Sequence, residues 1–289
     1  MEASPLWVEM SMFAVLVTAF LVGWGVLCSA EGFDPYVDHG GTVVGLAGRD
    51  FCVLASDTRL SQGYMIHSRN HSRILEVSSG CGVAGSGCWS DMRALGDALR
   101  HNAKVYEWQG RRSMSLGAMS NLLAAIMYGR RMFPYFTFTI LGGLDQVGRG
   151  ALFRYDAVGS FERVQAVCAG KGEQLMQPAL DRLTNMEEDA ASWRVTGIDD
   201  VFESAGENFV DLSVDEACAA VLEAYRSAAE REITIGDGVE MMVVERDATT
   251  DDGGGGGDRV DCGTEGRSST SRQPWQTRTR WLSYPLAKH

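Results

Sequence analysis

The sequence predicts a mixed α+β protein in which two β-sheets pack face to face and helices cover them on the outside. Apolar segments with a strand-like period occur in blocks, and pairs of longer segments with a helical period separate these blocks. This order indicates two packed sheets with outer helices, whereas regular alternation would indicate a single wound βαβ sheet. The chain of 289 residues, 45% of them hydrophobic, is long enough to bury a full core.

The first block contains four strands and is followed by two helices. We expect strands over residues 42–47, 52–56, 74–77 and 80–84, and helices over residues 89–108 and 116–132. The second helix ends before Pro134, because proline disfavours helical geometry in the residue that precedes it.

The second block repeats this order. We expect strands over residues 135–141, 151–155 and 164–168, helices over 173–184 and 214–231, and a last strand over 239–244. Gly142-Gly143 is interpreted as a turn. Ser213 and Glu216 have the spacing of a capping box, in which each side chain satisfies a free backbone N–H at the start of the last helix.

The two ends of the chain differ from this central part. Residues 1–32 form an apolar leader or propeptide, and Met12–Cys28 within it lacks charge. No Lys or Arg precedes this run, so the basic start of a secretory signal is missing, and a signal or anchor competes with a removable propeptide and with upstream sequence wrongly joined to the gene. Residues 248–289 contain five consecutive glycines and are expected to form a flexible Gly/Ser/Arg-rich tail.

Charge and cysteine usage narrow the possible functions. The net charge of -12 argues against nucleic acid as a partner, because phosphate binding requires a surplus of Lys and Arg. The seven cysteines form no C-x-x-C pair and do not combine with the five histidines at zinc-ligand spacing. They are expected to be reduced residues of the core, and neither a metal nor a cofactor is predicted. The glycine pattern of residues 80–85 is interpreted as a strand rather than a nucleotide site.

Six motifs in one order resemble the proteasome beta subunits of the N-terminal-nucleophile hydrolase family, and among them the non-catalytic type-1 group. The resemblance covers residues 33–247, and each motif alone is weak. The motifs are Gly40-Gly41-Thr42, Ser56-Asp57-Thr58-Arg59, Tyr128-Gly129-Arg130-Arg131-Met132-Phe133-Pro134-Tyr135, Gly142-Gly143-Leu144-Asp145, Tyr155-Asp156-Ala157-Val158-Gly159-Ser160 and Ser227-Ala228-Ala229-Glu230-Arg231.

The resemblance implies a four-layer α-β-β-α sandwich and a place in a heteroheptameric beta ring, two of which stack in the 20S core particle. The implied partners are the other alpha and beta subunits of the proteasome, with no nucleic acid and no membrane. The implied role is chamber building for ATP/ubiquitin-dependent protein degradation in the cytoplasm and nucleus.

The resemblance also places the pocket of the active relatives, in which an N-terminal threonine attacks the peptide bond with its own amine as base. Aligning Asp57 with the aspartate of that pocket puts Gly41, which has no hydroxyl, at the nucleophile position, one residue before Thr42. The lysine position holds Arg73, whose guanidinium stays protonated and cannot exchange a proton.

The supporting positions depart from the active set as well. The later Asp-x-x-Ser element aligns with Glu232 to Ile235, and the remaining serine position aligns with Lys171. Only Asp57 is kept, and a turn carboxylate that binds nearby N–H groups or Arg59 explains it without catalysis. Losing several members of a catalytic unit removes its activity, so a non-catalytic structural subunit is predicted.

Two alternatives remain open at this point. An active threonine peptidase, cut between Gly41 and Thr42, would require a one-residue shift that turns the strand's side chains to the opposite face. A secreted or membrane-anchored interaction protein is the interpretation that Met12–Cys28 favours.

Overall fold

The computed structural model describes residues 36–110, 112–183, 212–246 and 277–286. The chain divides into two compact units, residues 1–37 and 38–289, and every helix and strand below belongs to the second unit.

Ten strands form two antiparallel sheets of five. The first sheet has the order β10 (Ala166–Gly170), β1 (Thr42–Ala47), β2 (Phe51–Asp57), β11 (Gly238–Arg246) and β12 (Thr277–Pro285). The second has the order β5 (Ile74–Ser78), β6 (Cys81–Gly87), β7 (Thr137–Leu144), β8 (Gly150–Tyr155) and β9 (Phe161–Val164). A separate hairpin pairs β3 (Leu60–Gln62) with β4 (Met65–Ser68).

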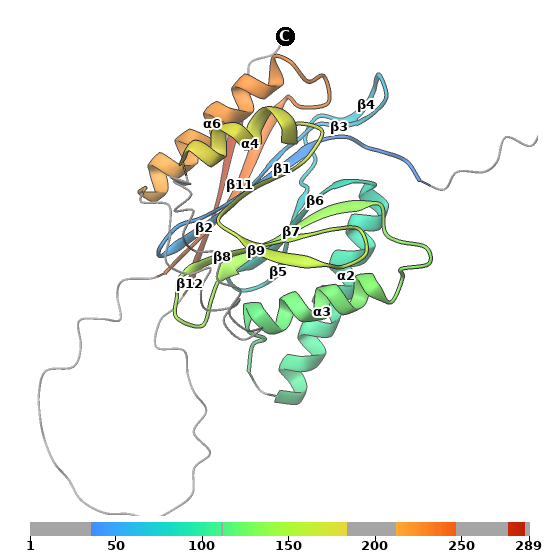
Figure 1. Cartoon of the computed structure of the whole chain (residues 1–289), viewed down its shortest axis with the longest axis vertical. Coiled ribbons are helices and arrows are strands. Elements are labelled where there is room, and N and C mark those ends of the chain that lie inside the picture. Colours follow the sequence, from blue (N-terminus) through green and yellow to red (C-terminus); the bar gives the residue numbers. More distant parts are fainter. Residues whose placement is uncertain (1–35, 111, 184–211, 247–276, 287–289) are drawn as a thin grey trace, which may run out of the picture. The chain divides into compact units, whose positions relative to one another are not determined.

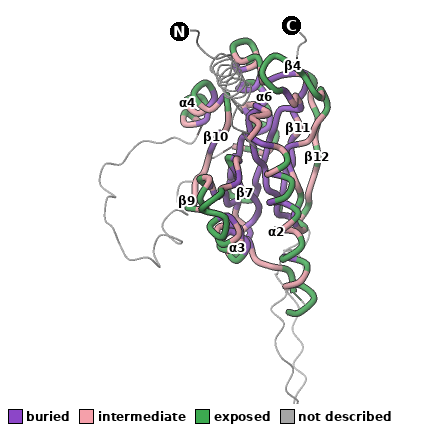
Figure 2. The backbone as a smooth tube through the Cα atoms, turned by 90° about the vertical axis from the view of Figure 1, so that its right-hand side faces the viewer, coloured by how far each residue is buried: buried purple, intermediate pink, exposed green. Residues whose placement is uncertain are grey.

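Helices cover the outer face of each sheet (Figure 1). The helices α4 (Glu173–Leu183) and α6 (Val214–Ala229) pack on the first sheet through one apolar cluster, and α2 (Trp89–Gly110) and α3 (Leu116–Tyr128) pack on the second through another. A third apolar cluster joins the inner faces of the two sheets, including Val43, Leu54 and Ile140. Figure 2 shows the strands as the buried middle of the unit and the helices with exposed outer faces. The four-layer α-β-β-α sandwich is therefore confirmed.

The predicted helices and strands are all present, with boundaries that differ by a few residues. The helix α3 ends at Tyr128, earlier than expected, because residues 129–133 form turns in which the Arg130 and Arg131 N–H groups bond to carbonyls three residues back. The capping box of Ser213 and Glu216 is present at the start of α6. The small strands β3, β4 and β9 were not predicted, because they are too short for a period to be visible.

Gly142 and Gly143 do not form the predicted turn but lie inside β7. A Cβ on Gly142 would lie 2.8 Å from Cδ2 of Leu152 between the two sheets, and a Cβ on Gly143 would lie 2.5 Å from the carbonyl oxygen of Gly80. The glycines are thus explained by close approach of neighbouring atoms rather than by chain reversal.

The predicted flexible tail is wrong for residues 277–285, which form the edge strand β12. Arg246 pairs directly with Thr277, and β12 lies antiparallel to β11 at the edge of the first sheet. Leu282 and Tyr284 pack against the apolar cluster under α6, while Trp281 is 43% exposed. The strand was missed because its first four residues, Thr277 to Arg280, are polar, and the adjacent apolar residues Trp281 and Leu282 break the alternation. Residues 248–276 and 287–289 lie outside the described residues, as do the leader 1–32 and its apolar run Met12–Cys28.

The described cysteines are free and buried, as expected: Cys52, Cys81, Cys88, Cys168 and Cys218. Burial raises the pKa of the Cys52 thiol to about 12, which keeps it protonated and unreactive. Within the described segments, no three His, Cys, Asp or Glu side chains are grouped as a metal site. Those segments also contain no helix that is long and apolar enough to cross a membrane.

The close approach at Gly143 gives a test of this packing. Gly143→Ala should lower the free energy of unfolding by about 1–3 kcal/mol, because the added methyl meets a backbone carbonyl in a closed sheet. Gly117→Ala, in α3, is the matched control: its Cβ meets nothing within 4 Å, and it should raise stability by about 0.5–1 kcal/mol. Urea unfolding of both variants measures the difference, and equal effects would contradict the packing.

Candidate functional site

The predicted nucleophile position is filled by another side chain. Gly41 precedes β1 with a φ of 81°, a backbone conformation that favours glycine. A Cβ on Gly41 would lie 2.3 Å from both Cζ and Nε of Arg73. The Arg73 side chain is 1% exposed. The guanidinium therefore occupies the space into which a threonine side chain would project.

Arg73 is held in this place by backbone carbonyls and one carboxylate. It directly precedes β5, and its Nη2 donates to the carbonyl oxygens of His39 (3.0 Å) and Arg59 (2.6 Å). Its Nε lies 3.5 Å from Oδ1 of Asp57. A guanidinium at this position supplies charge to the pocket but no proton acceptor.

Asp57 is the carboxylate at the centre of the arrangement. It ends β2, is fully buried, and its Oδ1 accepts a hydrogen bond from the Thr42 N–H at 2.8 Å. Burial raises the pKa of Asp57 to about 6 and outweighs Arg73 and the N–H groups of Thr42 and Arg59, which lower it. Asp57 thus binds backbone N–H groups as expected. The side chain of Arg59 pairs instead with Asp237, at 2.7 Å.

Thr42 has a structural role in the chain described here. Its hydroxyl oxygen accepts a hydrogen bond from the Gly172 N–H at 2.9 Å, and its carbonyl oxygen accepts one from the hydroxyl of Tyr225 at 2.9 Å. The residue is fully buried. Within β1 its side chain lies on the same face as Val44, which packs under α4 and α6, because successive residues of a strand alternate between faces. The Thr42 hydroxyl is therefore not presented to the pocket that Arg73 fills.

The residues before Gly41 are bonded into the same region. The His39 N–H donates to the Gly87 carbonyl at 3.0 Å, and the His39 carbonyl accepts from the Ser61 N–H at 3.3 Å. Nδ1 of His39 accepts a hydrogen bond from the Trp89 N–H at 3.2 Å. Burial, assisted by His67 and Arg73, lowers the pKa of His39, which favours the neutral ring that this acceptor role requires. His39 therefore fixes the path of the chain into β1.

Lys171 lies beside the pocket through its backbone. Its N–H donates to the Gly41 carbonyl at 3.1 Å, while its ammonium is 2.7 Å from Oδ2 of Asp38. The hydrogen bond with Asp38 raises the pKa of Lys171. The side chain is thus engaged with the segment before Gly41 and not with Asp57.

Glu232 and Ile235 make local contacts outside the pocket: Glu232 binds a residue of its own loop, and Ile235 packs in the core. Oε1 of Glu232 accepts hydrogen bonds from the N–H and hydroxyl of Thr234, at 3.2 Å and 2.8 Å. Ile235 is 1% exposed and belongs to the apolar cluster under α4 and α6. The structure thus brings together Gly41, Thr42, Asp57 and Arg73, with the Lys171 backbone beside them. Of the other two predicted positions, Glu232 belongs to a turn and Ile235 is a core residue.

Sequence reasoning missed two residues that position this site. The Tyr225 hydroxyl joins β1 to β2, because its single O–H is shared between the Thr42 and Ala55 carbonyls, at 2.9 Å and 3.1 Å. A tyrosine on the buried face of a helix signals that an acceptor is needed, but not which one. Asp237, with a φ of 64°, pairs with Arg59 and Arg69; the Gly-Asp-Gly sequence was the available signal.

The contact between Gly41 and Arg73 predicts a coupling between substitutions. Gly41→Ala should destabilise the chain by about 1–3 kcal/mol, and Arg73→Ala by about 3–5 kcal/mol because Asp57 is left buried without its partner. In the double variant, the methyl no longer meets the guanidinium. The loss of unfolding free energy in the double variant, measured by denaturant unfolding, should therefore be smaller than the sum of the two single losses by about 1–3 kcal/mol. Additive costs would contradict the contact.

The raised pKa of Asp57 predicts a pH dependence of stability. Because the folded state holds this proton more tightly than the unfolded state, the contribution is fully present below pH 3.8. It is lost as the pH rises through about 6. The unfolding free energy of the wild type, measured relative to Asp57→Asn, should therefore fall between pH 4 and 6 and level off above pH 7. A difference that grows with pH over this range would refute the assignment.

Comparison with known proteins agrees with the six motifs. The family model described as proteasome subunit matches residues 37–198. A proteasome subunit beta type-1 of Oryza sativa subsp. japonica is 39% identical over 221 residues, which cover 76% of this chain and 95% of that protein. The namesake of Danio rerio is 35% identical over 74% of this chain and 84% of its own length, and the beta type-6 subunit of Saccharomyces cerevisiae is 34% identical over 74% and 87%. The resemblance is confirmed, and the chain belongs to the proteasome subunit family.

Proposed function

We propose that this chain is a non-catalytic beta subunit of the 20S proteasome core. In this role it forms part of the wall of the proteolytic chamber and holds neighbouring alpha and beta subunits in register within stacked rings. Substrate would be cut by threonines of other subunits, in the ATP/ubiquitin-dependent degradation of proteins in the cytoplasm and nucleus. The names of its relatives support the assembly, and the pocket supports the lack of catalysis.

One observation carries this proposal: Arg73 occupies the side-chain space at Gly41. Covalent catalysis by this family requires a hydroxyl at that point and a base within reach of it. Here the position has no side chain, and the group that fills it is a permanently protonated guanidinium. The pocket therefore lacks both a nucleophile and the room for one.

The exposed apolar side chains support a subunit role. Tyr64 and Met65, at the tip of the β3–β4 hairpin, are 93% and 65% exposed, and Met132 and Phe133, after α3, are 89% and 60% exposed. A two-stranded hairpin is marginally stable by itself, and exposed apolar patches mark surfaces that partners cover.

The alternative of a peptidase with Thr42 at its N-terminus is less well supported. The Thr42 hydroxyl is buried against the Gly172 N–H, and Asp38, His39 and Gly41 are tied to the domain by hydrogen bonds and an ion pair. We therefore expect the chain of the assembled particle to begin upstream of Asp38.

Purification of the tagged chain from its native cells tests the proposal. The tagged chain should co-purify with alpha and beta subunits in one particle. An electrophilic peptide that reacts with N-terminal threonines should label other subunits of that particle and not this one. The intact mass of this chain should correspond to an N-terminus before Asp38.

The matched variant is Thr42→Val, which removes the hydroxyl and keeps the shape. Peptide hydrolysis by particles that carry it should equal that of the wild type. Labelling of a chain that begins at Thr42, lost in Thr42→Val, would establish the peptidase. A tagged chain recovered alone or in membranes would refute the ring role.

A further inference from the structure

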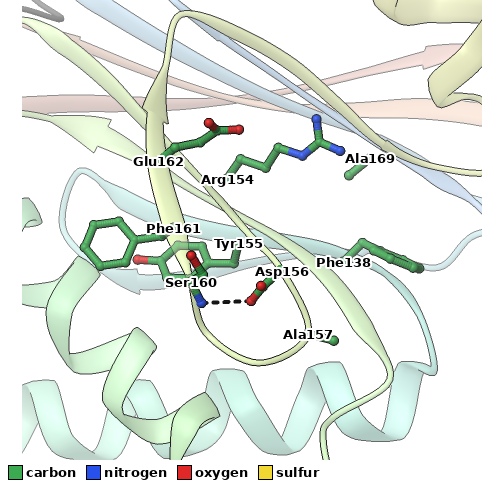
Figure 3. A pocket seen from close by; sticks show the side chains of 9 residues that line it. All are labelled: Phe138, Arg154, Tyr155, Asp156, Ala157, Ser160, Phe161, Glu162 and Ala169. Atoms are coloured by element: carbon green, nitrogen blue, oxygen red, sulfur yellow. Dashed lines mark hydrogen bonds between the residues drawn. The ribbon is translucent and has the colours of Figure 1, made fainter. Parts of the chain in front are cut away.

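A pocket of about 540 Å³, whose lining does not include Gly41, lies between an edge strand of each sheet. Its lining comes from β7, β8, β9, the turn between β8 and β9, and Ala169 of β10. Figure 3 shows Arg154, Glu162 and Phe138 around it. The volume is within the range of about 300–1,000 Å³ that is typical of ligand pockets.

One wall of the pocket is an exposed aromatic ring. Phe138 is 45% exposed, although all the remaining residues of β7 are buried. An exposed phenylalanine in a concave site offers a flat apolar surface for an aliphatic chain, and its ring face attracts a cation.

The charges around the pocket do not balance. Arg154 and Glu162 are direct partners in the β8–β9 ladder, yet Nη2 of Arg154 pairs with Oε1 of Glu173 at 2.7 Å. Oδ1 of Asp156 is occupied by the N–H groups of its own turn, those of Val158, Gly159 and Ser160. Glu162 has no ion pair with any residue that the structure describes. Among the described residues, neither Asp156 nor Glu162 has a cationic partner, and the carboxylate of Glu162 is the one that its own turn does not occupy. Glu162 and Phe138 lie on opposite sides of the pocket (Figure 3).

The edge strand argues for side-chain insertion rather than strand addition. β9 has four residues, and Glu162 and Arg163 are two of them. Short, charged edge strands resist pairing with another chain. A partner on this side would therefore be bound through a side chain that enters the pocket.

We infer that this pocket receives an arginine or lysine side chain from a neighbouring proteasome subunit. The aliphatic stem lies on Phe138, and the cationic group pairs with Glu162. This interface rests on the proposed subunit role, and it gives that role a contact of defined chemistry.

Competition for incorporation into the particle tests the interface. Tagged full-length variants are expressed in the native cells beside the untagged chain, and the share of each in purified particles is measured by mass spectrometry. Glu162→Lys should reduce the incorporated share about tenfold or more, because it places two like charges together. Glu162→Gln, which keeps the shape and removes the charge, should cause a smaller loss. Glu107→Lys, an exposed carboxylate on α2, is the matched control and should compete as the wild type does.

Each outcome decides a separate claim. Loss for Glu162→Lys that exceeds the loss for Glu107→Lys, with Glu162→Gln between them, supports the interface. The ion pair is overturned if Glu162→Lys is incorporated as well as the control variant. It is also overturned if the incorporated share of Glu162→Gln falls as far as that of Glu162→Lys, and in both cases the subunit role stands. If the wild-type tagged chain enters no particle, the subunit role itself fails and the interface fails with it.

Discussion

The ion pair of Arg73 with Asp57, buried beside Gly41, is the constraint on which the rest of the site depends. Asp57 ties β2 to β1 through the Thr42 N–H, and Arg73 ties the segment before β5 to the carbonyls of His39 and Arg59. A buried guanidinium without such partners would be costly, so the pair and the carbonyls must be present together. Glycine at position 41 is then required, because a larger residue would collide with the charge that holds the strands in place.

This arrangement leaves position 41 without a hydroxyl and fills the adjoining space with a guanidinium, which supports the non-catalytic role that we propose. The two sheets, the outer helices and the strand that leads away from Gly41 are those of a fold that can present a reactive threonine. Here the entrance to β1 is bonded on both sides, through His39 to Gly87 and Ser61 and through Gly41 to Lys171. These hydrogen bonds are consistent with the proposed role as a structural subunit of an assembly.

Much of the fold could be predicted because its signals are local. The strand and helix periods located four helices and eight strands of the described residues, and Ser213 with Glu216 located the start of α6. The predictions for Gly142-Gly143 and β12 were wrong because contacts distant in the sequence determine their structure. Leu152 and the Gly80 carbonyl leave no room for side chains at the two glycines, and pairing with β11 makes residues 277–285 a strand. The identity of Gly41 and Arg73 could be read from the sequence, but their 2.3 Å approach could not, because it depends on the path of the chain before β5. Tyr225 was missed for the same reason, since its acceptors are carbonyls far away in the sequence.

The central claim is that a guanidinium replaces the nucleophile. A density map of the assembled particle, at a resolution that separates side chains around positions 41, 57 and 73, tests it most directly. The account predicts guanidinium density in contact with Gly41 and Asp57, and an unbroken chain through residues 38–41. Arg73 turned away from an open pocket, with the chain beginning at Thr42, would contradict it.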